Sequence, residues 1–288
     1  MENWVKAGKI AAESLNYGCE LAKPGIKLLE LAEKIEAKIK ELGGKQAFPV
    51  NLSLNELAAH YTPASDDTTI LKAEDLLKID VGVHIEGHIG DCARTVGDDK
   101  ELIRASEACL AAAIPLCVPG RKIREIGKAI AEAANEHGFI SIRNLSGHGI
   151  SHFDLHCGLS IPNFDNGDET VLKEGAIIAI EPFVTRGNSA RVSEGKPSGI
   201  YKLEKVKPVR DMNARKILSF IANEYSSLPF ASRWLEKEFP KAKFYIQLLI
   251  KEGILRSYPQ LYESSKGNVS QAEHTIQVKE NPVILTQA

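Results

Sequence analysis

The stretch DVGVHIEGHIGDCART, residues 80–95, has two runs of alternating residues separated by Glu86-Gly87. Such alternation is typical of half-buried strands, and a two-residue connection that ends in glycine predicts a tight β-hairpin. In a hairpin of this kind, residues an odd number of positions apart in the sequence face the same side of the sheet. Asp80 and Asp91 therefore share one face of the hairpin.

The two faces of this hairpin differ: the aspartate face also carries the small residues Gly82 and Ala93, which leave room above the sheet. The other face is mostly apolar and is expected to pack on the protein core. It carries Ile79, Val81, Val83, Ile85, Gly90 and Cys92. Two carboxylates on a half-buried face repel each other, and one would take up a proton unless a positive charge lay between them. The stretch alone leaves two interpretations open: a solvated polar face, or a site for a divalent cation.

Length and composition place the chain among globular proteins. Its 288 residues and 43% hydrophobic content suffice for one large domain or two smaller ones, and its net charge of −2 implies no polyanionic partner. Five cysteines without a CxxC pair are typical of reduced thiols in the cytoplasm. The N-terminus lacks the apolar core of a signal peptide, and no apolar run approaches the roughly 20 residues that span a bilayer. We therefore expect a soluble, cytoplasmic monomer without a membrane partner.

An internal repeat indicates how the chain is organised. Residues 23–44 and 118–139 align at an offset of 95, with seven identical positions. In each copy Pro-Gly precedes an amphipathic helix that ends at a glycine, another helix precedes the copy, and strand-like segments follow it. Helix periodicity alone would not explain the shared Pro-Gly and terminal glycine, so the pattern favours duplication. The sequence predicts an α/β (α+β) domain with pseudo-two-fold symmetry, in which helices cover one face of a mostly antiparallel sheet.

A basic segment interrupts this domain. Residues 198–262 contain 12 Lys or Arg and 6 Asp or Glu, a net charge of +6, whereas the rest of the chain carries −8. Periodicity predicts three short helices and then a turn at Pro259. The helices are expected at about 212–225, 231–239 and 241–252. This pattern is typical of a helical, winged-helix-like insert, so residues 1–197 and 263–288 are expected to form the main domain.

Three further segments carry isolated residues of metal-ligand type. His148 lies between Gly147 and Gly149, which let backbone approach whatever the imidazole contacts. Glu181 ends the apolar run GAIIAIE and Glu273 lies in the strand-like VSQAEHTIQV, where a buried glutamate without a partner is unfavourable. With the two hairpin aspartates, the four carboxylates carry a charge that matches two divalent cations. A thiolate-free, carboxylate-rich set suits Mn²⁺, Fe²⁺, Co²⁺ or Zn²⁺.

The motifs DVGVHIEGHIGDCART, LSGHGI with LHCGLSIPN, AIEPF and SQAEHTI resemble, in this order and spacing, those of the methionine aminopeptidases. The segment inserted before SQAEHTI resembles the feature that separates type II from type I enzymes, and the start of the chain resembles the short archaeal form. The resemblance covers essentially the whole chain and implies the pita-bread fold, in agreement with the internal repeat. It also implies an enzyme that removes the N-terminal methionine of nascent polypeptides and peptides when the second residue is small.

The resemblance further implies a role for each ligand-type residue. Asp91 and Glu273 would bridge two divalent metal ions, and Asp80 would chelate one of them. His148 and Glu181 would complete the coordination of the other. The expected cofactors are therefore two metal ions per chain, chosen from Co²⁺, Mn²⁺, Fe²⁺ and Zn²⁺.

His60 and His156 match the two active-site histidines of that family. In the implied reaction Glu181 carries a proton from the attacking water to the leaving amine. His156 and His60 would donate hydrogen bonds to the carbonyl oxygen and the neighbouring peptide, so both would also bind substrate. The expected methionine pocket is formed by Phe48, Leu155 and Tyr258.

Two other interpretations stay open. An Xaa-Pro peptidase, either a prolidase or an aminopeptidase P, shares the fold and the ligand types, but such enzymes usually carry an additional N-terminal domain and lack a helical insert. A non-catalytic relative could keep the fold as a protein- or RNA-binding module, and its sign would be lost ligands; here all five are present. The basic insert is expected to be a solvated face, with ribosome proximity as the alternative and no specific nucleic-acid partner.

Overall fold

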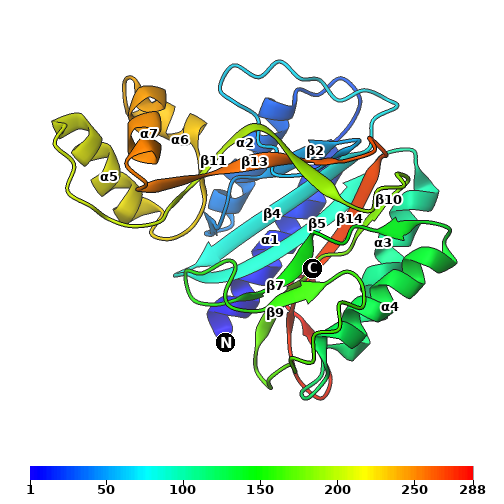
Figure 1. The fold of residues 1–288 in the computed structure, drawn as a ribbon. Coiled ribbons are helices and arrows are strands. Elements are labelled where there is room, and N and C mark those ends of the chain that lie inside the picture. Colours follow the sequence, from blue (N-terminus) through cyan, green and yellow to red (C-terminus); the bar gives the residue numbers. More distant parts are fainter. Residues whose placement is uncertain (288) are drawn as a thin grey trace.

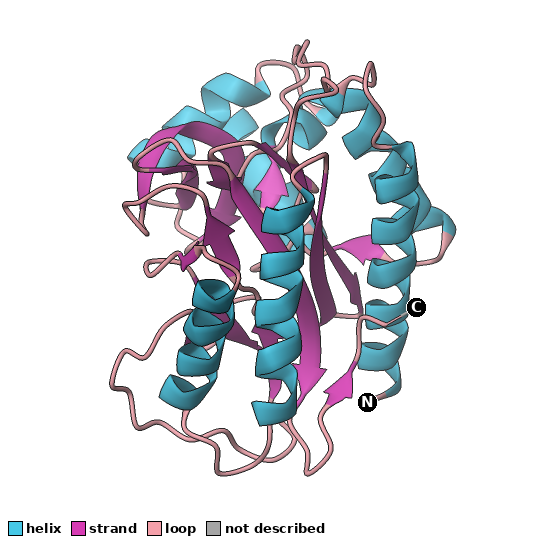
Figure 2. Ribbon diagram, turned by 90° about the vertical axis from the view of Figure 1, so that its right-hand side faces the viewer, coloured by secondary structure: helices cyan, strands magenta, loops and turns pink. Residues whose placement is uncertain are grey.

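The computed structural model describes residues 1–287 and contains a large sheet with four helices along one side (Figure 1, Figure 2). The helices are α1 (Glu2–Leu21), α2 (Leu28–Glu41), α3 (Lys100–Ala113) and α4 (Ile123–Glu136), with a 3₁₀ turn at Ile114–Leu116. The strands are β1 (Lys45–Gln46), β2 (Asn51–Leu54), β4 (Leu77–Ile85), β5 (His88–Val96), β6 (Ile140–Ser141), β7 (Ser146–Ile150), β8 (Ser160–Pro162), β9 (Ile177–Ile180), β10 (Phe183–Thr185), β14 (Val269–Gln277) and β15 (Val283–Ile284). All strand pairings in the described part of this sheet are antiparallel, which confirms the predicted architecture.

Strands β4 and β5 form the expected hairpin. Glu86 and Gly87 both have positive φ, 48° and 80°, as a type I′ turn requires, and this turn matches the right-handed twist of the strands. The register places Asp91 opposite Gly82, so that Asp91 and Asp80 are diagonal neighbours on one face. The other face of the hairpin is buried against α1 and α2, as predicted.

Helices α2 and α4 repeat each other in position and in hydrogen bonding. Their bounds coincide when the sequence offset of 95 is applied, and each begins after a lysine with extended backbone. The glycine of each Pro-Gly pair donates its N–H to a leucine carbonyl, Gly25 to Leu71 and Gly120 to Leu172. The pseudo-two-fold relation inferred from the sequence is therefore present in the structure.

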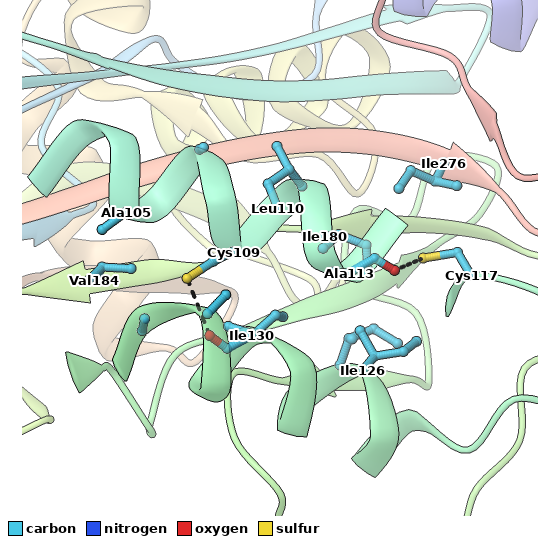
Figure 3. Close-up of a cluster of buried hydrophobic side chains, with 14 of the residues drawn as sticks. Ala105, Cys109, Leu110, Ala113, Cys117, Ile126, Ile130, Ile180, Val184 and Ile276 are labelled. Atoms are coloured by element: carbon cyan, nitrogen blue, oxygen red, sulfur yellow. Dashed lines mark hydrogen bonds between the residues drawn. The ribbon is translucent and has the colours of Figure 1, made fainter. Parts of the chain in front are cut away.

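Two apolar cores lie between helices and sheet, one in each half of the domain. The first packs α1 and α2 on β2, β4 and β5. The second packs α3 and α4 on β9, β10 and β14 (Figure 3). Here the thiols of Cys109 and Cys117 donate to the carbonyls of Ile130 and Ala113, at 3.2 and 3.5 Å. All five cysteines are free, and within residues 1–287 no helix is both long and apolar enough to cross a bilayer.

Strand β14 joins the two halves. It pairs with β5 of the first half through Ala272 and Glu273, and with β9 and β10 of the second half along the rest of its length. Figure 1 shows β14 in orange-red between β5 and β10. The N-terminal hairpin and a strand from the C-terminal end of the chain therefore meet in the middle of the sheet.

The segment between β10 and β14 adds three helices and most of a second, four-stranded sheet. Its elements are β11 (Val192–Leu203), α5 (Met212–Glu224), β12 (Phe230–Ala231), α6 (Ser232–Glu238), α7 (Ala242–Lys251) and β13 (Leu255–Glu263). The three helices lie where the periodicity predicts them. The fourth strand of the sheet is β3 (Leu57–Ala59), which comes from the N-terminal half and leads directly into His60.

The turn predicted at Pro259 is wrong. Pro259 lies inside β13, opposite Pro197 on β11, between two irregularities in the register. Proline is tolerated in a strand where the ladder is interrupted, and here both facing residues lack an N–H donor. The carbonyl of Pro259 is therefore available to a side chain, and its partner is the imidazole of His60.

A buried ion pair ties α6 to the main domain. Arg233 on α6 is 1% exposed and pairs with Glu36 on α2. The guanidinium of Arg233 also donates to the hydroxyl of Thr62 and the carbonyl of Pro63. The indole of Trp234 donates to the second oxygen of Glu36 at 3.0 Å. Because both charges are removed from water, each depends on the other for compensation.

Removing Arg233 is expected to destabilise the fold strongly. Arg233→Met leaves Glu36 buried without its cation, and breaking a buried pair from one side costs about 3–5 kcal/mol of unfolding free energy. Urea unfolding measures this loss. Lys237→Met is the matched control, because Lys237 and Glu33 also join α6 to α2 but are 60% and 44% exposed; it should change the unfolding free energy by less than about 1 kcal/mol. Equal losses in the two variants would contradict the importance of burial.

Candidate active site

A cavity of about 230 Å³ is lined by residues of the hairpin, of β14 and of the segment between β10 and β14. Five ligand-type residues line it, each from a different part of the chain: Asp80 from β4, Asp91 from β5, His148 from β7, Glu181 from the β9–β10 connection and Glu273 from β14. The pairing of β14 with β5 and β9 is what brings these segments together. Every residue that the sequence analysis proposed as a metal ligand lines this one cavity.

The ligand atoms of Asp91, His148 and Glu273 all lie within 4.8 Å of one another. Nε2 of His148 is 3.6 Å from Oδ2 of Asp91 and 3.6 Å from Oε1 of Glu181. These separations are too long for hydrogen bonds, and they suit atoms that each bind a common cation at about 2.0–2.2 Å. The geometry therefore fits a metal centre better than a hydrogen-bonded network.

Four carboxylates share this cavity, and within residues 1–287 no lysine or arginine lines it. Burial raises the pKa of Asp80 to about 7, and burial together with the charge of Asp80 raises the pKa of Asp91. Burial and the charge of Asp91 raise the pKa of Glu181 and of Glu273 well above their ordinary values. Oδ1 of Asp80 and Oδ1 of Asp91 have no hydrogen-bond partner in the described chain. Divalent cations would supply both the missing charge and the missing partners, so these residues fit a metal site.

The glycines that flank His148 serve close packing of neighbouring backbone. A Cβ on Gly147 would collide with the carbonyl of Ala179 on β9, and one on Gly149 with the carbonyl of Cys157. Strand β7 can therefore lie tight against β9, which holds His148 opposite Ala179. These glycines therefore have a packing role in addition to the one expected from the sequence.

His60 follows β3 with a left-handed backbone, φ 63°. Its Nδ1 lies 3.2 Å from the carbonyl oxygen of Pro259, which can only accept, so Nδ1 carries the proton. Burial lowers the pKa of His60 to about 4, so the ring is neutral near neutral pH and Nε2 keeps its lone pair. An edge contact with the Tyr258 ring, 5.4 Å between centroids, supports this orientation. For this tautomer the remaining nitrogen is an acceptor, and the donor role toward substrate expected from the sequence would require the other tautomer.

His156 lies on the loop 151–159, with its ring centroid 4.3 Å from that of His148. The loop is fastened to the tip of the hairpin, where the N–H of Phe153 donates to the carbonyl of Gly87 at 2.9 Å. A Cβ on Gly87 would collide with the Phe153 ring, so glycine in the turn also lets the loop approach. The surrounding protein and the neighbouring His148 lower the pKa of His156, which keeps its ring neutral.

The apolar part of the cavity is built around Phe48. A Cβ on Gly82 would collide with the Phe48 ring, so the room predicted above the hairpin is filled by this ring. Leu155 packs in the same apolar cluster as Phe48, and Tyr258 reaches the cavity from β13. The three residues expected to form the methionine pocket all line the cavity.

The cavity is also lined by residues that the sequence analysis did not single out, among them Asn51, Asn144, Ile200 and Pro229. Ile200 and Pro229 are apolar, and in the sequence nothing separates them from core residues. Asn51 had a detectable signal, because pairing the strand-like NLSL with the first hairpin strand would have placed it beside Asp80.

Residues 2–280 match metallopeptidase family M24. The chain belongs to this family. Among curated relatives, a methionine aminopeptidase of Pyrococcus horikoshii is 48% identical, with 99% of each chain covered. A methionine aminopeptidase of Methanocaldococcus jannaschii is 42% identical, with 99% of this chain and 97% of that protein covered. The resemblance drawn from the motifs is therefore confirmed.

Solved structures confirm the fold. A methionine aminopeptidase from Thermotoga maritima has a TM-score of 0.72 at 25% identity, with 100% of this chain and 96% of that chain covered. A prolidase from Pyrococcus furiosus has a TM-score of 0.62 at 20% identity, and the match covers 63% of that chain; this likeness concerns the fold alone. Since the near full-length M24 relatives are methionine aminopeptidases, the Xaa-Pro alternative is not favoured.

Proposed function

We propose that this M24 chain is a methionine aminopeptidase, which removes the N-terminal methionine of polypeptides whose second residue is small. The observation that carries the proposal is the cavity in which four carboxylates and a histidine meet beside an apolar cluster. The archaeal methionine aminopeptidases, alike over nearly the whole chain, support it. An aminopeptidase needs a pocket that holds one N-terminal residue and is closed beyond it. The cluster around Phe48 would form the closed end of this pocket.

We further propose two divalent metal ions per chain, chosen from Co²⁺, Mn²⁺, Fe²⁺ and Zn²⁺. Asp91 and Glu273 would be shared between the two ions, and Asp80 would bind one of them. His148 and Glu181 would bind the other. When bound, the ions supply Lewis acidity and lower the pKa of a water molecule. The partnerless oxygens of Asp80 and Asp91 support this assignment.

Glu181 is proposed to move the proton during peptide hydrolysis. Its side chain follows β9 and is 15% exposed, so it can contact a water and the substrate within the cavity. A carboxylate at this position can hold a proton between two steps, first as a general base and then as a general acid. Glu181 would take this proton from the attacking water and give it to the leaving amine.

The two cavity histidines are proposed to contact the substrate in opposite ways. His156, neutral and beside His148, would donate one N–H to the carbonyl oxygen as negative charge develops on it. His60 would accept the N–H of the peptide group through Nε2, since its Nδ1 proton points at Pro259. Together they would orient the scissile peptide through hydrogen bonds to a carbonyl oxygen and to a peptide N–H.

Residues 198–262 are proposed to be an insert that completes the substrate pocket, with residues 1–197 and 263–288 as the catalytic domain. The apolar core of α5–α7 and the positions of Ile200 and Tyr258 in the cavity lining support this division. The basic charge of the insert is proposed to be a solvated face, with proximity to the ribosome as the alternative. We propose a cytoplasmic monomer that acts on nascent chains, in line with five free cysteines.

Peptides that begin Met-Gly, Met-Ala or Met-Ser are expected to release methionine, whereas Met-Lys and Met-Trp peptides are expected to be poor substrates. The Phe48 cluster would hold the methionine, and the residues around this 230 Å³ cavity would leave space only for a small second side chain. We expect the two groups to differ in kcat/KM by about 100-fold. Chromatography of free methionine over time measures the difference.

The same assay separates the alternatives. Protein treated with a chelator is the negative control and should recover when Co²⁺ or Mn²⁺ is added. Faster cleavage of Xaa-Pro peptides than of Met-Ala peptides would replace the proposed function by an Xaa-Pro peptidase. Efficient release of methionine from Met-Lys peptides would show that the crowding around the second residue is absent.

A further inference from the structure

Asn51 on β2 has a buried hydrogen-bond acceptor without a donor. The residue is 5% exposed, lines the cavity, and donates through Nδ2 to the carbonyl of Pro49 at 2.8 Å. Since that carbonyl can only accept, the orientation of the amide is determined, and Oδ1 is the atom left over. Within residues 1–287, Oδ1 has no hydrogen-bond partner. Buried polar atoms without partners are rare in native proteins, so this oxygen calls for a donor that comes from outside the chain.

The residue opposite Asn51 also has a partnerless oxygen. The register of β2 and β4 places Asn51 opposite Asp80, and both residues line the cavity. Side chains of directly opposed residues extend to the same face of a sheet, with their Cβ atoms about 4.5–5.5 Å apart. Oδ1 of Asp80 also lacks a hydrogen-bond partner in the described chain. The proposed metal ion would bind this oxygen of Asp80, which leaves Oδ1 of Asn51 as the neighbouring acceptor that needs an N–H or O–H donor.

We propose that Asn51 is a substrate-binding residue whose Oδ1 accepts a hydrogen bond from the α-amino group of the substrate. This inference rests on the proposed function, because an aminopeptidase substrate brings its free N-terminus into the cavity. A primary amine has a basic lone pair as well as N–H bonds, so one N–H can reach Asn51 while the nitrogen lies beside the ion that Asp80 would hold. A peptide nitrogen inside a chain has a single N–H and a delocalised lone pair, so it cannot make both contacts. Asn51 therefore helps to restrict cleavage to the first residue of a chain.

Asn144 offers a comparison within the same cavity. Its Oδ1 accepts from the N–H of Val192, and its Nδ2 donates to the carbonyl of Val192, both at 2.8 Å. Its amide is therefore already satisfied by the protein. Asn144 and Asn51 are both asparagines that line this cavity. They differ in whether the amide oxygen has a hydrogen-bond partner, so Asn144 is a matched control.

The test uses protein loaded with Mn²⁺ and two ligands that differ only in the α-amino group, L-methionine and 4-(methylthio)butanoate. Calorimetry gives both dissociation constants for the wild type and each variant. Asn51→Leu and Asn51→Ala should each weaken binding of L-methionine by about tenfold and leave the affinity for 4-(methylthio)butanoate unchanged. Asn51→Asp keeps an acceptor oxygen and should retain the preference for the amine. Two truncations are used so that a folding defect in one leaves the other to decide.

The ratio of the two affinities isolates the contact between Asn51 and the amine, as in a double-mutant cycle. Asn144→Leu should keep the wild-type ratio, whatever its effect on each affinity. Equal weakening of both ligands by the Asn51 truncations would overturn the proposal and show that the oxygen binds water or shapes the pocket; an unchanged ratio would overturn it as well. A wild type that neither binds L-methionine nor cleaves Met-Ala peptides would overturn the proposed function and this inference together, whereas a wild type that does both confines the failure to Asn51.

Discussion

Asp91→Ala is expected to show no measurable turnover, and added Co²⁺ or Mn²⁺ is not expected to restore it. The carboxylate of Asp91 lies among the ligand atoms of His148 and Glu273, and its Oδ1 has no hydrogen-bond partner within residues 1–287. Removing this carboxylate takes a ligand from both proposed ions at once. It also removes one of the two carboxylate oxygens that lie 3.6 Å from Nε2 of His148. Metal content and methionine release are measured on the same samples, before and after metal addition.

Two controls are needed to interpret this result. Wild-type protein should lose activity on chelation and recover when either metal is added. Asp98→Ala removes an exposed carboxylate just beyond the end of the same hairpin and should behave like the wild type. Full activity of Asp91→Ala would exclude a dinuclear site built on this residue.

His156→Ala is expected to lower kcat by about 10²–10³ while retaining bound metal. The neutral ring lies 4.3 Å, centroid to centroid, from that of His148 and is proposed to donate to the oxygen on which charge develops. Losing such a donor raises the barrier of the chemical step and leaves the carboxylate ligands in place. Steady-state kinetics and metal analysis are needed together, because only their combination separates substrate contact from metal binding.

His148→Ala is the control for this prediction. Because His148 is a proposed ligand, its removal should weaken metal binding, and excess metal should restore part of the activity. If instead His156→Ala lost its metal while His148→Ala kept it, the roles assigned to the two histidines would have to be exchanged.

The hairpin and the paired helices could be predicted because their signals are local. Alternation around Glu86-Gly87 and the parity of the spacing between Asp80 and Asp91 determine which side chains share a face, whatever the rest of the chain does. The repeat at an offset of 95 likewise needs only helix periodicity and the Pro-Gly start. Placing His148 or Glu273 in the same cavity required the resemblance to a known family, since no local pattern relates those segments.

What could not be predicted depends on pairing between distant segments. Pro259 gives the signal of a turn, and its place in a strand follows from Pro197, which faces it across the ladder. The proton position on His60 depends in turn on the carbonyl that these two prolines leave available. Ile200 lines the cavity only because β11 passes over it, and an apolar residue carries no mark of such a position.

The central place of β14 also bears on when the protein becomes active. This strand supplies Glu273 and joins the two halves of the sheet, yet it comes long after the hairpin in the chain. Before β14 has been synthesised, the hairpin with Asp80 and Asp91 can form. The cavity then still lacks Glu273 and the strand that joins its two halves. Contacts between segments so far apart in sequence also form slowly, because a long loop must close first. A chain that has not yet reached β14 therefore has no complete site for hydrolysis.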